Sequence, residues 1–152
     1  SPYQNVMNVA RKKGEAVASL FPNDVVLSTD TIVCLDGKIY GKPKDRKDAY
    51  NTLATFSGMT HEVVSGVSII SKKLNMTMYV KSYVTFKKLT KEMIDDYLKT
   101  DEPYDKAGSY AIQGEGRSLI EGYSGSLDNI IGLPIEYIKD MLRVMLNEVE
   151  NR

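Results

Sequence analysis

The chain has 152 residues and no formal net charge, a length that suits one domain and a balance that argues against a general nucleic-acid binder. A single cysteine, Cys34, excludes an internal disulfide framework and is typical of a reducing compartment. Because no apolar run approaches the roughly 18 residues of a membrane span, we expect a protein of the cytoplasm with no membrane partner.

The first part of the chain alternates between helical and strand patterns. Apolar residues spaced three and four apart predict a helix over residues 6–20, which a proline-containing segment ends. A short buried strand is expected over residues 25–28, followed by a hairpin around Asp36-Gly37, because this pair suits a turn that needs positive φ. A second helix is predicted over residues 44–58, where Gly58 is the usual kind of stop.

The second part of the chain begins with two strands and ends with a helix. Residues 60–71 and 76–86 are rich in β-formers and are predicted to pair antiparallel. Thr90 is placed to cap a short helix, residues 101–132 have the polar, glycine-rich composition of a loop, and Pro134 begins the last helix. These patterns predict one α/β domain with a mixed sheet.

Polar clusters occur where predicted strands end or helices begin, the places where α/β sheets bind ligands. There are four of them, STDT, GKPKD, DKAGSYAIQGEG and GSLDNIIGLP, at residues 28–31, 41–45, 105–116 and 125–134. Their glycines and lysines can hold phosphate, and Asp30 can hold a divalent metal or orient a water. A structural role is open for each: Asp30 can end a strand, Lys42 can be solvated, and residues 105–116 can be a plain loop.

Two isolated side chains with reactive chemistry have simpler interpretations. His61 adjoins a strand and has no partner histidine or cysteine cluster, so we expect a structural residue rather than a metal ligand. Cys34 lies in an apolar run without an obvious base, so we expect a small core residue.

The four clusters, in this order, resemble the Maf family of nucleoside triphosphate pyrophosphatases. The matching stretches are STDTIVCLDGKIYGKPKD, LATFSGMTHEVVSGVSII, DEPYDKAGSYAIQGEG and GSLDNIIGLP. The resemblance implies a single domain over residues 1–152, with an elongated, twisted, mixed sheet and two lobes around a cleft, similar to the inosine triphosphate pyrophosphatases. It also implies cleavage of a nucleoside triphosphate between the α- and β-phosphates, a divalent cation (Mg²⁺ or Mn²⁺) and a homodimer.

The resemblance implies a role for four charged residues. Asp30 matches the family's catalytic aspartate, a general base or metal ligand acting on the attacking water. Lys13, Lys42 and Lys106 match three lysines that contact phosphate. We expect the predicted hairpin to return Lys42 to the same mouth as Asp30.

Two further positions match a specificity pair of the family. Thr31 and Gln113 stand where one branch, which prefers dTTP and UTP and accepts some modified pyrimidine nucleotides, has threonine and glutamine. A glutamine amide offers both a donor and an acceptor, which can match the edge of uracil or thymine.

One part of the family pattern has no counterpart at the start of the chain. Family members open with a strand and a Ser-Pro-Arg-Arg loop that binds phosphate, then an acid near the metal, whereas Ser1-Pro2 is followed by Tyr3-Gln4. We therefore expect an N-terminally incomplete domain with weak or no activity as it stands, and a hydrolase in the complete protein. The alternative is a nucleotide-binding or interaction module linked to septum formation.

Overall fold

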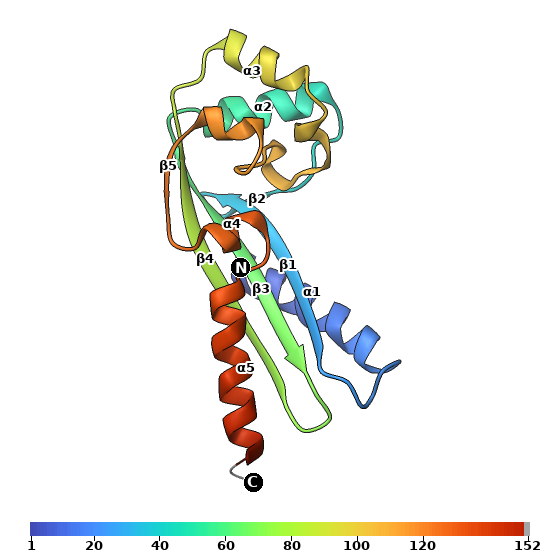
Figure 1. Ribbon diagram of the computed structural model, residues 1–152. Helices are drawn as coiled ribbons and strands as arrows, with labels where there is room; N and C mark the ends of the chain where they lie inside the picture. The colour runs from blue at the N-terminus through green and yellow to red at the C-terminus, as the bar shows by residue number, and fades with distance from the viewer. Residues whose placement is uncertain (151–152) are drawn as a thin grey trace.

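The computed structural model describes the backbone of residues 1–150 and the side chains of residues 1–147, so the last two residues of the predicted domain lie outside the described part. The helices and strands follow one another along the chain (Figure 1). In order they are α1 Pro2–Ala18, β1 Val26–Leu35, β2 Lys38–Tyr40, α2 Arg46–Phe56, β3 Thr60–Ile70, β4 Asn75–Phe86, α3 Lys91–Leu98, β5 Ile120–Ser124, α4 Leu127–Ile131 and α5 Ile135–Glu150. Short 3-10 helices occupy Glu102–Asp105, Ala107–Ser109 and Glu115–Leu119.

The sheet has the strand order β2-β1-β3-β4-β5. The predicted α/β class, with helices flanking an elongated sheet, is confirmed. Every pairing among the described strands is antiparallel, however, where a mixed sheet was expected. The reason is that β2 and β3 run in the same direction, with α2 connecting them, but β1 lies between them. The two strands that could have formed a parallel pair are therefore not neighbours.

The polar stretch STDT lies inside a strand. Residues 25–28 were predicted as a short buried strand separate from the hairpin, but Val26–Leu35 is one strand, β1, and Leu27 is 44% exposed. The threonines suit an extended backbone, and pairing with β3 continues without interruption from Val26 to Cys34. The predicted loop over residues 101–132 likewise contains β5, α4 and the 3-10 helices.

Successive side chains of β1 and β3 point to opposite faces of the sheet, and different helices cover the two faces. On one face Val6 of α1 packs with Ile32 and Val64. On the other face α5 packs against Val67 and Ile69. Beyond one end of these strands, α2, α3 and the segment between α3 and β5 gather into a second lobe (Figure 1). The predicted two-lobed arrangement is therefore present, and none of the helices described has the length and apolar character needed to cross a bilayer.

Helix α1 lies unusually close to the sheet at Gly66. A Cβ on this glycine would overlap the backbone carbonyl of Val6, so the strand needs a residue without a side chain here. A second close contact is made by Ser28, whose hydroxyl donates a 2.5 Å hydrogen bond to the carbonyl of Ala10. These contacts fix α1, and with it Lys13, against β1.

Replacing Gly66 with alanine should lower the free energy of unfolding by about 1–3 kcal/mol, because the added methyl group forces α1 away from the sheet. Urea unfolding of both proteins measures the difference. The matched control is Gly122→Ala in β5, where an added Cβ meets nothing within 4 Å. Equal stabilities for the two variants would contradict the close approach of α1.

Candidate functional site

A cavity of about 250 Å³ opens between β1, the segment after α3, and α4. It brings together four of the residues predicted from the sequence. These are Thr31, Lys42, Lys106 and Gln113. The remaining walls come from Val33, Val63, Asp105, Ala107, Tyr110, Ala111, Ile112, Ile130 and Ile131. Residues from five separate stretches of sequence therefore meet around one hollow.

Hydrogen bonds from the sheet hold one wall of this cavity in place. The hydroxyls of Thr31 and Ser65 lie 2.8 Å apart, and Thr31 also lies 3.4 Å from the carbonyl of Gly132. Buried Asn129 of α4 donates from Nδ2 to the carbonyl of Val63 at 3.2 Å. The cluster GSLDNIIGLP thus acts as a wall: its polar residues attach α4 to the sheet and its isoleucines face the hollow.

Two lysines bring positive charge to the cavity. The backbone N–H of Gly108 donates to the carbonyl of Gly41 at 3.2 Å, which ties the end of the hairpin to the segment that carries Lys106. The ammonium of Lys106 lies 3.7 Å from the carboxylate of Asp105. Lys42 forms no salt bridge with any residue that the structure describes. Its charge is therefore available to an anionic ligand.

Asp30 and Lys13 lie together, but on the other face of β1. Lys13 Nζ donates to Asp30 Oδ1 at 2.9 Å, and Asp30 is paired with Gly66, the residue on which α1 rests. Because side chains alternate along a strand, Asp30 and Thr31 leave β1 in opposite directions. Asp30 is in the middle of a strand rather than at its end, and it does not line the cavity with Lys42. The expectation that the hairpin returns Lys42 to the same mouth as Asp30 is therefore wrong, and the predicted residues fall into two groups, called half-sites below, on opposite faces of β1.

An open stretch of strand edge separates these half-sites. β2 pairs with β1 only from Val33 to Leu35, and in the described chain no strand pairs with the outer edge of β1 before Val33. Lys42 follows β2 by two residues and so leaves the hairpin beside this edge.

The floor of the cavity rests on a buried aromatic cluster. Tyr110 OH and His61 Nε2 share a hydrogen bond of 2.7 Å, and the His61 ring stacks on Phe56 with centroids 4.4 Å apart. Burial lowers the pKa of His61 from 6.5 to about 4, so the ring is neutral at physiological pH. His61 is thus structural, as predicted, and Cys34 is a core residue whose thiol pKa is raised by burial.

The sequence did not reveal the apolar side chains that shape this cavity. Tyr110, Ile112 and Ile130 stand in short apolar runs inside segments rich in polar residues and glycine, so no periodicity marked them. Their one signal is position: Tyr110 and Ile112 stand within three residues of the predicted Gln113, and Ile130 lies inside the predicted cluster GSLDNIIGLP.

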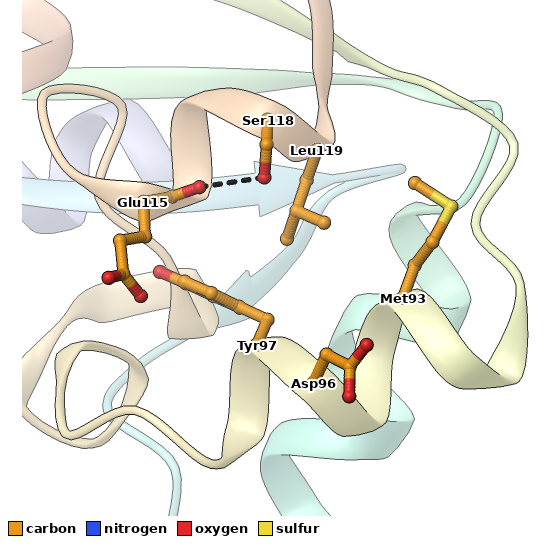
Figure 2. A pocket seen from close by; sticks show the side chains of 6 residues that line it. All are labelled: Met93, Asp96, Tyr97, Glu115, Ser118 and Leu119. Atoms are coloured by element: carbon orange, nitrogen blue, oxygen red, sulfur yellow. Dashed lines mark hydrogen bonds between the residues drawn. The ribbon is translucent and has the colours of Figure 1, made fainter.

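A larger hollow, about 560 Å³, lies between α3 and the Glu115–Leu119 segment (Figure 2). Its walls carry the carboxylates of Asp96 and Glu115 and the apolar side chains of Met93 and Leu119. Among the described residues no lysine or arginine lines this hollow, and Asp96 is itself paired with Lys99 at 2.8 Å, so no positive charge is left for a phosphate. This hollow, which contains none of the predicted site residues, is therefore the poorer candidate for an anionic ligand.

Asp30 was predicted as the contact for a divalent cation, and its Oδ1 accepts from Lys13 Nζ at 2.9 Å. The described residues contain no group of three or more histidine, cysteine, aspartate or glutamate side chains that could hold a metal by themselves. Mg²⁺ is commonly held by one or two carboxylates, with phosphate oxygens and water as the other ligands. The single carboxylate of Asp30 fits an ion held mainly by phosphate oxygens and water, but does not fit a metal held by protein alone.

These features define an α/β protein with a cationic small-molecule cavity suited to a phosphorylated ligand. The chain belongs to the Maf family, since the family model described as Maf-like protein matches residues 1–145. It is 47% identical over 135 residues to the dTTP/UTP pyrophosphatase of Bacillus cytotoxicus. The aligned residues make up 89% of this chain and 71% of that protein. It is 45% identical over 145 residues to the dTTP/UTP pyrophosphatase of Clostridioides difficile, and this alignment covers 94% of this chain and 75% of that protein. The protein of the same name from Latilactobacillus sakei is 41% identical over 143 residues, an alignment that covers 94% of this chain and 79% of that protein.

Proposed function

We propose that this protein is a nucleotide pyrophosphatase that hydrolyses dTTP and UTP to the monophosphate and pyrophosphate. The observation that carries the proposal is the cavity in which Thr31, Lys42, Lys106 and Gln113 meet. The names of the relatives from three genera point to the same reaction.

The cavity is suited to a base rather than to a whole nucleotide. Its volume of about 250 Å³ is below the range of about 300–1,000 Å³ that is usual for drug-sized ligands. Ile112 and Ile130 offer apolar surface to a pyrimidine ring, and Gln113 offers a donor and an acceptor to its edge. The triphosphate then extends outward past Lys42 and Lys106.

The reaction is inferred from the chemistry of Asp30 and of the lysines. Asp30 accepts a proton from a water molecule, whose oxygen bonds to the α-phosphorus while the bond to the bridging oxygen of the β-phosphate breaks. Pyrophosphate leaves, and the lysines stabilise the charge that develops on it. Lys13, whose Nζ lies 2.9 Å from Asp30 Oδ1, places a third lysine beside the proposed base.

Asp30 would also hold the divalent cation, Mg²⁺ or Mn²⁺. The ion supplies charge neutralisation for the phosphates when it is bound. The cytoplasmic location and the homodimer complete the proposal: a free, buried Cys34 supports a reducing compartment, and the dimer rests on the resemblance alone.

Release of pyrophosphate from a panel of nucleoside triphosphates tests the function. With Mg²⁺ or Mn²⁺ present, dTTP and UTP should be hydrolysed in preference to CTP, ATP and GTP. Lys42→Gln should lower kcat/KM for UTP by about ten- to a hundredfold, because a charge contact to phosphate is lost. Lys44→Gln is the matched control, since Lys44 is exposed and does not line the cavity.

Two outcomes would count against the proposal. Equal losses in the Lys42 and Lys44 variants would show that general charge, rather than the cavity, governs turnover. Binding of UTP without release of pyrophosphate would favour the nucleotide-binding module in place of the enzyme.

A further inference from the structure

Glu102 makes an unusual set of contacts with the glutamine loop, residues 111–116, which carries Gln113. Its Oε1 accepts from the backbone N–H of Glu115 at 3.0 Å. Its Oε2 accepts from the backbone N–H of Gly116 at 2.9 Å and from the hydroxyl of Tyr97 at 2.5 Å. Both carboxylate oxygens of Glu102 therefore act as acceptors in this arrangement.

Tyr97 extends the same network to the other end of the glutamine loop. Its hydroxyl accepts from the backbone N–H of Ala111 at 3.2 Å while donating to Glu102. The side chain is only 5% exposed, and it reaches from α3 towards the segment that begins at Glu115 (Figure 2). Burial and the bond to Glu102 both raise the pKa of Tyr97, so the hydroxyl keeps its proton. The loop is thus held on both sides of Gln113.

Two glycines of the loop are required by this network. A Cβ on Gly114 would overlap the carboxylate of Glu102. A Cβ on Gly116 would lie 2.6 Å from the carbonyl of Ala111 and 2.9 Å from the hydroxyl of Tyr97. The spacing QGEG therefore lets the backbone close around Glu102, and Gln113 stands at the exposed side of that closed loop.

We propose that Glu102, acting with Tyr97, is a positioning residue that aims Gln113 into the cavity and so sets the selectivity for uracil and thymine bases. The inference rests on the proposed function, because it concerns the base that the same cavity takes. Glu102 and Tyr97 do not line the cavity themselves, and both act through the backbone of the glutamine loop.

The substitution Glu102→Gln tests the network with almost no change in shape. It replaces one acceptor oxygen with an NH₂ group, which then faces a donor. Tyr97→Phe removes the link to Ala111 in a second, independent way. The matched control is Tyr104→Phe, because Tyr104 OH donates to the carbonyl of Leu98 at 2.8 Å and forms no hydrogen bond with the glutamine loop.

Binding of α,β-methylene-UTP and α,β-methylene-CTP gives a measurement without turnover, since the α–β bridge of these analogues is not hydrolysed. In Glu102→Gln and Tyr97→Phe the preference for the uridine analogue should fall about ten- to a hundredfold, as expected when a specificity group is misplaced. The kcat for UTP should change less than KM, because Asp30 is untouched. Amides of residues 111–116 should exchange hydrogen about tenfold faster, with β3 and β4 unchanged.

The outcomes separate this inference from the proposed function. Faster exchange in the glutamine loop with an unchanged preference would overturn the positioning role and leave the pyrophosphatase intact. If the parent protein binds neither analogue, the proposed function fails, and the side-chain amide signals of Gln113 decide the matter in the free protein. A change of those signals in Glu102→Gln but not in Tyr104→Phe supports the positioning role, and unchanged signals overturn it.

Discussion

Replacing Asp30 with asparagine should reduce the release of pyrophosphate from dTTP and UTP by about 10²–10⁴-fold relative to the parent chain, the usual contribution of a general base. Asparagine keeps the shape of the side chain but removes the basic oxygen and the negative charge. Binding of α,β-methylene-UTP should change much less, because the base cavity and its two lysines lie on the other face of β1.

The Asp30→Asn variant should remain folded. The carboxylate makes one ion pair, with Lys13, whose side chain is 55% exposed. Such surface pairs contribute about 0–1 kcal/mol. A thermal melt therefore separates a chemical loss from an unfolded protein.

The matched control for Asp30 is Asp36→Asn in the hairpin turn. Asp36 has a φ of 50°, a conformation that asparagine tolerates, so this variant removes one carboxylate without strain. It should retain parental activity. If Asp30→Asn hydrolyses UTP as fast as Asp36→Asn does, Asp30 is not the base, and its pairing with Lys13 is structural.

Much of the fold could be predicted because local chemistry decides it. Thr90 and Asp45 cap helices α3 and α2. Their side chains accept hydrogen bonds from the backbone N–H groups of Met93 and Asp48, respectively. Asp36-Gly37 turns with positive φ at both residues, as the pair predicts. These features depend on a few neighbouring residues, so the order of helices and strands follows from spacing.

The division of the site could not be predicted in the same way. Reading Asp30 as the end of a strand hid the alternation that sends Asp30 and Thr31 to opposite faces. Glu102 was overlooked because its partners are donors 13 and 14 residues further along the chain, inside a segment read as a loop. Contacts at that separation are set by the path of the backbone, which periodicity does not describe.

Stability should fall as the pH is lowered from about 6.5 towards 4, because His61 is buried in its neutral form. The folded pKa of about 4 lies below the unfolded value of 6.5, so the unfolded chain binds a proton that the folded protein refuses. The contribution of neutral His61 to the free energy of unfolding is therefore fully present above pH 6.5 and is lost as the pH falls from 6.5 to about 4. At about 1.4 kcal/mol for each pKa unit, the loss is about 3 kcal/mol.

Urea unfolding at several pH values measures this loss, and His61→Phe isolates it. The chain has one histidine, so no other imidazole titrates in the window. Phenylalanine keeps the ring against Phe56 but leaves Tyr110 without its hydrogen-bond partner, so the variant should be less stable near neutral pH. Its free energy of unfolding should also change less as the pH is lowered. An equal slope of the free energy of unfolding against pH in both proteins would mean that carboxylates, rather than His61, cause the acid sensitivity.

Nucleotide binding should follow the same pH range. Because Tyr110 lines the cavity, a parent protein that loses His61 packing in acid should also lose nucleotide binding.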